Sequence, residues 1–263
     1  MEEFNFKKKF GQNFLKNKAV IGNIAKCGDV LSNSLIIEVG PGSGSLTVEM
    51  AKLYPDSNIL AYEIDETLED ILYDNTHEFK NINIKFADFL KCDLNKDIAG
   101  YSFDNLYFIS NVPYYITTPI LFKLIDSNLP FEKIVMMVQK EVGDRFSSKV
   151  SCKNYGALTV ILNYYFEIKK EFLVDRNQFV PRPNVDSVVV SFKRKKNQDA
   201  VDKDKFMKLV HDSFKFKRKM LRNNLKDYDL DKISKVLEKY GYDLSVRAEA
   251  LDYKVFVEIA NSL

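Results

Sequence analysis

The sequence predicts an α/β fold with an open, mostly parallel sheet, followed by a small helical part at its C-terminal end. From about residue 18 to residue 140, apolar runs of strand length alternate with amphipathic windows of helix length, as in parallel sheets. Two β-rich runs follow, and beyond about residue 195 proline disappears, lysine becomes dense and helical spacing takes over. We therefore expect one domain over residues 1–195 and a helical domain over residues 196–263.

The individual elements follow from local patterns of apolar residues. Strands are predicted for short apolar or β-rich runs at 35–39, 58–62, 82–86, 106–110, 134–138, 166–174 and 187–192. The last two are separated by Pro181 and Pro183 and should form a closing hairpin. Helices are predicted at 46–53, at 66–74, in a window that ends at Tyr165, and over 206–225 and 230–263.

Composition excludes several classes of protein. Three widely spaced cysteines without a CxxC pair do not suit a disulfide framework and fit a reducing cytoplasm. Two histidines and no Cys/His cluster make a metal site unexpected. The chain has no run of eighteen apolar residues and no apolar region behind its first lysines. We therefore expect a cytoplasmic protein that neither is secreted nor spans a membrane.

A glycine-rich turn follows the first predicted strand, with glycines at 40, 42 and 44. Such a turn lets a nucleotide-like ligand approach the backbone closely, although it can also be a tight turn without a ligand. Glu63 ends the second strand, where its carboxylate could accept hydrogen bonds from both ribose hydroxyls. Ser45 stands where the dinucleotide fingerprint has its third glycine, which favours S-adenosylmethionine over NAD.

A further carboxylate follows the third strand. Asp88 could accept from the amino group of an adenine, and Phe89 could cover the adenine ring. The alternative is an aspartate that only caps the loop. Together with the glycine turn and Glu63, Asp88 favours an adenosine-bearing ligand.

The strand at 106–110 ends in Asn111-Val112-Pro113-Tyr114. The exocyclic amine of adenine is a poor nucleophile because its lone pair is delocalised into the ring. Asn111 Oδ1 and the Val112 carbonyl could grip both N6 hydrogens, and Pro113 would fix the backbone between them. Tyr114 offers a ring for a flipped base, so phenylalanine should serve almost as well. The alternative is an ordinary strand-end turn with a core tyrosine.

These motifs together resemble the ribosomal RNA adenine-N6 dimethyltransferase family over nearly the whole chain. The resemblance rests on KFGQNFL at 9–15, EVGPGSGSLT at 38–47, EID at 63–65, AD at 87–88, NVPY at 111–114 and FVPRPNVDS at 179–187. It implies a Rossmann-like class I S-adenosylmethionine-dependent methyltransferase domain with a small C-terminal helical domain. Six motifs in the right order are far more specific than any one of them.

The resemblance also implies roles for individual residues. Methyl-donor contacts are expected from Gln12, Asn13, Leu15, Gly40, Gly42, Glu63, Ile64, Asp88, Phe89 and Asn111. The catalytic set would be Asn111, Val112, Pro113, Tyr114 and Phe179, with Tyr114 and Phe179 sandwiching the target adenine. The sequence departs from the family pattern at Val112, where only the carbonyl is needed, and at Tyr115, which leaves the local pocket shape open.

Residues 214–225 and 247–251 resemble the small-subunit branch of the family. The resemblance then implies dimethylation of two adjacent adenines in a 3′-terminal hairpin of 16S RNA, in the 30S subunit or its precursor, by a monomer. Alternatives are a 23S RNA or DNA adenine-N6 methyltransferase and a non-catalytic RNA-binding assembly factor. A nicotinamide-dependent oxidoreductase is opposed by the missing third glycine and by Asn111-Val112-Pro113-Tyr114.

Positive charge is concentrated in one stretch of a chain whose net charge is only +2. Residues 193–226 contain thirteen Lys or Arg against four Asp and no Glu. We expect a helix over 214–226 with Lys215, Lys219, Arg222 and Lys226 on one side and Val210, Phe214, Leu221 and Leu225 on the other. Lys215, Arg218, Lys219 and Arg222 are the predicted RNA contacts, unless the run is only a solvated face.

Overall fold

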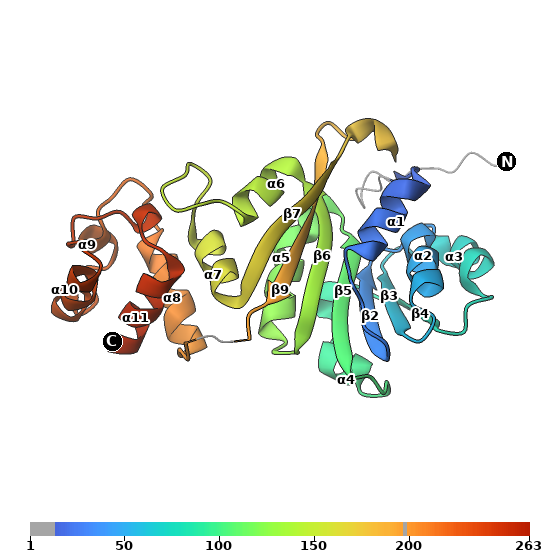
Figure 1. Cartoon of the computed structure of the whole chain (residues 1–263), viewed down its shortest axis with the longest axis horizontal. Helices are drawn as coiled ribbons and strands as arrows, with labels where there is room; N and C mark the ends of the chain where they lie inside the picture. The colour runs from blue at the N-terminus through green and yellow to red at the C-terminus, as the bar shows by residue number, and fades with distance from the viewer. Residues whose placement is uncertain (1–13, 197–198) are drawn as a thin grey trace. The chain divides into compact units, whose positions relative to one another are not determined.

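The computed structural model describes residues 14–196 and 199–263 (Figure 1). The chain forms two compact units that are discontinuous in sequence. The first ends at Gly143 and also takes in Lys169–Lys193, and the second comprises Asp144–Ile168 and Arg194–Leu263. Residues 144–168 therefore pack with the C-terminal helices, whereas the domain boundary near residue 195 stays a prediction.

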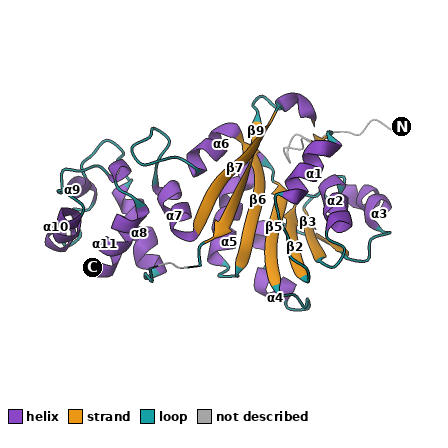
Figure 2. Ribbon diagram, in the orientation of Figure 1, coloured by secondary structure: helices purple, strands orange, loops and turns teal. Residues whose placement is uncertain are grey.

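The described residues contain a seven-stranded sheet, most of which belongs to the first unit, and helices lie between its strands in the sequence (Figure 2). The strands are β2 (Ser34–Val39), β3 (Asn58–Glu63), β4 (Ile82–Phe86), β5 (Asn105–Asn111), β6 (Phe131–Gln139), β7 (Phe166–Val174) and β9 (Ser187–Arg194). Their order in the sheet is β4-β3-β2-β5-β6-β9-β7. The first five in this order are parallel, and β9 is antiparallel to β6. The predicted α/β fold class and its strands are confirmed.

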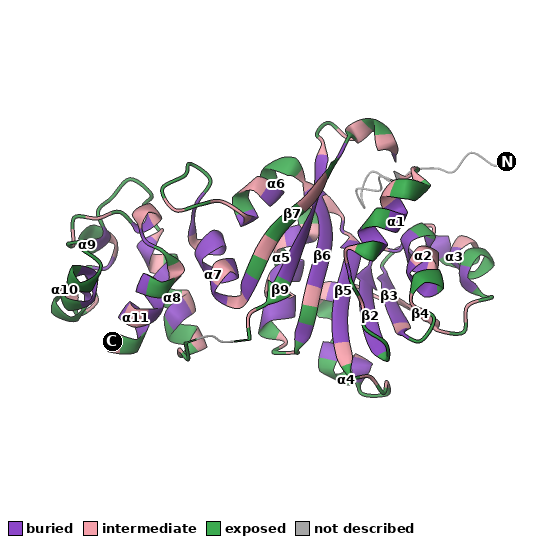
Figure 3. Ribbon diagram, viewed as in Figure 1, coloured by how far each residue is buried: buried purple, intermediate pink, exposed green. Residues whose placement is uncertain are grey.

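The central strands β2, β5 and β6 are buried on both faces, which explains why they are almost entirely apolar (Figure 3), whereas the edge strands β4 and β7 are partly exposed. On one face, α1 (Lys18–Lys26) and α2 (Ser45–Leu53) pack beside each other over a core that includes Ile36, Ile109 and Met137. On the other face, the Phe108 ring contacts Phe89. Phe89 lies in a turn that contacts α5 (Thr117–Asp126).

Shorter elements complete the first unit. These are η2 (Glu66–Leu68), α3 (Glu69–Thr76), η3 (Phe89–Lys91), α4 (Leu94–Ile98), η4 (Tyr114–Ile116), η5 (Arg176–Gln178) and the start of α6 (Lys140–Phe146). Two short segments form a separate antiparallel pair that the sequence did not predict, β1 (Phe14–Leu15) and β8 (Phe179–Val180). In this pair Leu15 lies opposite Phe179.

The second unit is helical. It contains α7 (Ala157–Tyr165), α8 (Lys203–Ser213), α9 (Leu221–Asn224), α10 (Leu230–Lys239), η6 (Ala248–Ala250) and α11 (Tyr253–Ser262). Aromatic contacts join three of these helices, because Tyr164 packs on Phe206 and Phe214 packs on Phe256. Within residues 14–196 and 199–263, every helix is too short or too polar to span a bilayer.

The helix predicted over 214–226 is wrong. Helix α8 ends at Ser213, turns follow, and α9 covers only Leu221–Asn224. The Asn224 side chain donates to the Ser213 and Phe216 carbonyls, at 2.7 and 3.3 Å, which in a continuous helix would accept backbone N–H groups. The backbone N–H of Leu221 donates to the Val246 carbonyl instead of to a helical partner. The predicted basic and apolar sides of one helix therefore do not exist.

Candidate active site

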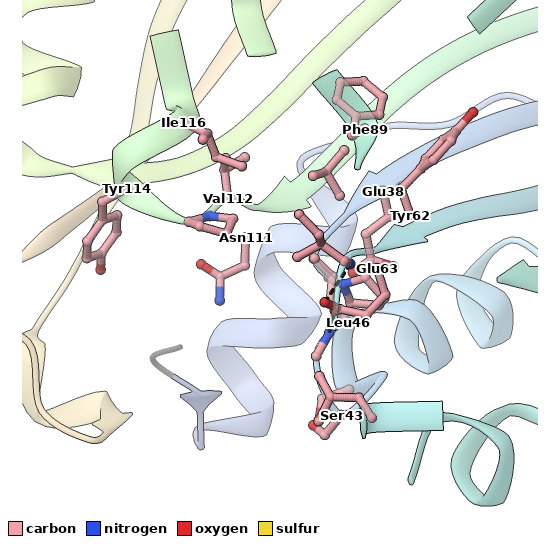
Figure 4. Close-up of a pocket in the computed structure, with 18 of the residues that line it drawn as sticks. Glu38, Ser43, Leu46, Tyr62, Glu63, Phe89, Asn111, Val112, Tyr114 and Ile116 are labelled. Carbon is pink, nitrogen blue, oxygen red and sulfur yellow. Dashed lines mark hydrogen bonds between the residues drawn. The ribbon is translucent and has the colours of Figure 1, made fainter. Parts of the chain in front are cut away.

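A cavity of about 300 Å³ opens in the first unit at the carboxyl ends of β2, β3, β4 and β5 (Figure 4). Parallel strands place the loops that follow them at one edge of the sheet, where ligands bind in open α/β folds. The cavity brings together eleven of the predicted site residues: Leu15, Gly40, Gly42, Glu63, Ile64, Asp88, Phe89, Asn111, Val112, Pro113 and Tyr114. Their side chains and backbone come from five separate segments of the chain.

The glycine turn after β2 forms one wall. Gly40 and Gly42 have φ values of 71° and 61°, a left-handed backbone that residues with a Cβ rarely adopt. A Cβ on Gly40 would also lie 3.4 Å from Cδ of Pro113. That distance is an ordinary contact, so the left-handed backbone is what favours glycine at position 40, and the turn and the Asn111–Tyr114 loop line the same cavity.

Glu63 stands at the end of β3 with only 5% of its surface exposed. Its Oε1 accepts hydrogen bonds from the backbone N–H groups of Ile64 and Asp65, both at 2.9 Å, and its Oε2 accepts one from Gly42 at 3.2 Å. Burial raises the pKa of this carboxyl group, and the three backbone donors oppose that shift. A carboxylate has about four acceptor positions, so Oε2 keeps the larger capacity for a ligand hydroxyl.

A second carboxyl group, Glu38, lies in the cavity wall and was missed by the sequence analysis. It is buried within β2, where Thr47 Oγ1 donates to its Oε2 at 2.7 Å. Burial raises the pKa of Glu38 to about 8, and the charge of Glu63 adds to the shift. The group is therefore mostly protonated at neutral pH. A single acidic residue in an otherwise apolar strand was the signal that could have found it.

The turn after β4 carries Asp88 and Phe89. Asp88 Oδ1 accepts from the backbone N–H of Leu90 at 3.1 Å, so the capping role given as the alternative is present in a residue that also lines the cavity. The Phe89 ring is 3% exposed and packs edge-on against Tyr62 at 5.1 Å. Little of that ring is free to cover a ligand, and its stacking role stays a prediction.

The Asn111–Tyr114 loop forms the wall of the cavity that lies across from Glu63. Asn111 ends β5, Val112 is buried, and Pro113 has φ −55° and ψ 128°, which turns the chain into η4. Figure 4 shows the Asn111 amide and the Tyr114 ring extending from this loop, with Glu63 across the cavity. The loop therefore presents an amide and an aromatic ring at the edge of the cavity that holds Glu63.

Tyr115 also lines this cavity, although 57% of its surface is exposed. Burial raises the pKa of its hydroxyl, and the charges of Asp88 and Glu63 contribute. In the sequence this position stands out only as a departure from the family pattern. The structure makes it part of the rim.

Some predicted residues are not brought to the cavity. Phe179 is 3% exposed and lies in the apolar core with Ile21 and Met137. Its proposed contact with a base therefore stays a prediction, for which the ring now offers little surface. Gln12 and Asn13 lie outside the described residues. The predicted RNA contacts Lys215, Arg218, Lys219 and Arg222 are all exposed residues of the second unit.

Comparison with known proteins assigns the chain to a family. Residues 3–263 match the family described as ribosomal RNA adenine dimethylase. The ribosomal RNA small subunit methyltransferase A of Streptococcus pneumoniae serotype 2 (strain D39) is 40% identical over 270 residues, covering 99% of this chain and 92% of the relative. The protein of the same name from Lactococcus lactis subsp. lactis (strain IL1403) is 38% identical over 269 residues, with 99% and 91% covered.

Solved structures agree with this assignment. A dimethyladenosine transferase from Plasmodium falciparum is 26% identical, with a TM-score of 0.77 over 94% of this chain and 95% of that one. The 23S rRNA methyltransferase ErmE, 24% identical, has a TM-score of 0.73 over 95% and 99% and shares the fold. Given this match and the cavity that unites its motifs, the chain belongs to the ribosomal RNA adenine dimethylase family.

Proposed function

We propose that this chain transfers methyl groups from S-adenosylmethionine to N6 of two adjacent adenines in a 3′-terminal hairpin of 16S RNA, acting as a monomer in the cytoplasm on the 30S subunit or its precursor. The observation that carries the proposal is the placement of the Asn111–Tyr114 loop on the cavity that also holds the glycine turn and Glu63. The residues proposed to hold the donor and those proposed to bind the base therefore line one cavity, which supports methyl transfer between them.

The residues of the cavity fit an adenosine-bearing donor. Glu63 offers a fixed carboxylate oxygen to a ribose, Gly40 and Gly42 leave the backbone open to close approach, and Asp88 lies after the neighbouring strand. S-adenosylmethionine, when bound, supplies an electrophilic methyl group. The protein residues therefore need only to orient the acceptor amine and to exclude water.

Asn111 and Val112 are proposed to orient that amine. The Asn111 side-chain oxygen and the Val112 carbonyl accept the two N6 hydrogens and favour a pyramidal nitrogen, whose lone pair is then available. Tyr114 stacks on the extruded adenine. The methylated amine is acidic and loses its proton to solvent, so no dedicated general base is needed.

The choice of RNA rests on the relatives and on the second unit. The relatives with the highest identity cited above are named as small-subunit methyltransferases. In the second unit the exposed cations Lys215, Lys217, Arg218 and Lys219 flank Phe216 in the sequence, and the Lys215 ammonium lies 5.9 Å from the centroid of that ring, of which 55% is exposed. Among the described residues, none of these four cations is paired with a carboxylate. Unpaired cations beside an exposed ring suit a phosphate backbone with accessible bases.

The decisive experiment compares substrates. Purified protein is incubated with labelled S-adenosylmethionine and with immature 30S particles, 50S particles or duplex DNA, and the modified nucleotides are mapped by mass spectrometry. We expect N6-dimethyladenosine at two adjacent positions of 16S RNA only. Methylation of 50S particles or of DNA instead would show that the substrate is 23S RNA or DNA. Donor binding without any methyl transfer would favour the non-catalytic assembly factor.

A further inference from the structure

The Tyr114 side chain is tied to a second, buried hydroxyl group. The hydroxyls of Tyr114 and Ser187 share a hydrogen bond of 2.6 Å. Ser187 is the first residue of β9 and is fully buried, whereas Tyr114 is half-buried in η4. Sequence reasoning treated the tyrosine hydroxyl as dispensable, and the structure gives it a partner.

This bond joins parts of the sheet that are not neighbours. Asn111 at the end of β5 lies opposite Met137 of β6, and Gln139 at the end of β6 lies opposite Ser187 of β9. The Tyr114 side chain therefore reaches past the end of β6 to a rigid point on β9. Ser187 is buried and its strand is paired with β6 along its length, so we expect it to move less than the loop that carries the tyrosine.

We propose that Ser187 is a positioning residue, which sets the orientation of the Tyr114 ring for stacking on the target base. The inference rests on the proposed function, because it assigns Tyr114 to base stacking. Without the bond, the ring would lie on a loop held locally by weaker contacts, such as that of Thr117 Oγ1 with the Tyr114 carbonyl at 3.2 Å. If the Tyr114 ring is already fixed before the base binds, binding does not have to immobilise it. Less conformational entropy is then lost on binding.

The bond orients the ring and has no part in proton transfer. Burial raises the pKa of the Tyr114 hydroxyl, and the bond to Ser187 lowers it only in part. The tyrosine therefore stays protonated at neutral pH. Loss of the hydrogen bond between Tyr114 and Ser187 should slow the chemical step. It should not weaken donor binding, because neither hydroxyl is assigned to the donor.

A double-mutant cycle tests the pair. The variants are Ser187→Ala, Tyr114→Phe and the double variant, assayed in single turnover on 30S particles at saturating donor and RNA. We expect each single variant to slow methylation about 3- to 10-fold, and the double variant to be no slower than either. Ser191→Ala is the matched control, since Ser191 lies on the same strand and its hydroxyl donates to Glu171 at 2.6 Å, outside the cavity. The control should retain the wild-type rate.

Two further measurements separate positioning from damage to the fold. Donor affinity by calorimetry should be unchanged in all variants, and the fluorescence of 2-aminopurine placed at the target adenine should show weaker stacking in Ser187→Ala. Rates that multiply in the double variant, or unchanged 2-aminopurine fluorescence, would overturn the proposal. Because the fluorescence needs base binding but no transfer, it still tests Ser187 if wild-type protein fails to methylate RNA, which would overturn the proposed function alone.

Discussion

The Asn111–Tyr114 loop and the helix of the basic segment at 214–226 were both predicted from short sequence patterns, and only the first prediction of local structure was correct. The loop follows a strand that pairs with β2 on one side and, in continuous register from Tyr107 to Asn111, with β6 on the other. The basic segment has helical spacing, but Leu221 and Arg222 donate their backbone N–H groups to the distant residues Val246 and Leu244. Periodicity thus predicts structure well where backbone partners are regular, and poorly where a remote segment supplies them.

The largest expected effect concerns Asn111. Asn111→Ala removes one of the two acceptors proposed for the N6 hydrogens, so the single-turnover methylation rate should fall by two or more orders of magnitude, about 3 kcal/mol. Calorimetry should show a smaller loss in S-adenosylmethionine affinity. Asn105→Ala, at the other end of the same strand, is the control and should retain the rate. A wild-type methylation rate in Asn111→Ala would contradict the proposal that the Asn111 side chain orients the N6 amine.

The next effect concerns the donor. Glu63→Ala should weaken S-adenosylmethionine binding by about 1–3 kcal/mol in calorimetry, since it removes charge-assisted hydrogen bonds. Glu63→Gln keeps one acceptor oxygen and should lose less, and Glu66→Ala, an exposed glutamate three residues on, should lose nothing. The raised pKa of Glu63 means that its ionised form is lost at a higher pH than in an exposed glutamate. Donor affinity should therefore decline early as the pH falls from neutral, and equal affinities in all variants would refute the assignment.

A smaller effect is expected for the basic segment. Its lysines and arginines do not form the predicted stripe on one helix, but Lys215, Lys219 and Arg222 are exposed. Reversing Lys215, Lys219 and Arg222 to Glu should weaken RNA binding about tenfold at moderate salt. The slope of log affinity against log salt should become shallower by about two to three, because three phosphate contacts are lost.

The matched control reverses three other exposed lysines of the second unit, Lys232, Lys235 and Lys254. Binding of the 30S particle is measured from low to high salt for both triple variants, with donor affinity as a check on the fold. If the variant with Lys215, Lys219 and Arg222 reversed keeps the wild-type salt slope, these residues do not contact RNA and the segment is only a solvated surface.

The smallest expected effect concerns Asn224, whose side chain contacts the turns that replace the helix predicted over 214–226. Asn224→Ala removes the donors to the Ser213 and Phe216 carbonyls and should destabilise the second unit by about 1 kcal/mol. Amide hydrogen exchange should become faster at 214–220. The exposed neighbour Asn223→Ala serves as control, and equal exchange in both variants would show that the turns do not depend on the Asn224 side chain.

The sequence by itself determined the α/β fold, its strands and most of the cavity. Glycines at 40 and 42, Glu63, Asp88 and Asn111 each follow a predicted strand, and parallel pairing necessarily gathers strand ends at one edge of the sheet. Their assembly required no knowledge of side-chain packing. The alternation of elements and a few residue types at strand ends were sufficient.

Only the tertiary structure decided the remaining features. The burial of Phe179, the bond between Tyr114 and Ser187, and the packing of residues 144–168 with the C-terminal helices all depend on contacts between distant segments. The turns between α8 and α9 likewise involve such contacts, because the Asn224 side chain donates to the Ser213 carbonyl and the backbone N–H groups of Leu221 and Arg222 donate to Val246 and Leu244. Sequence spacing records which face of an element is apolar, but it does not record which remote group satisfies a given hydrogen bond.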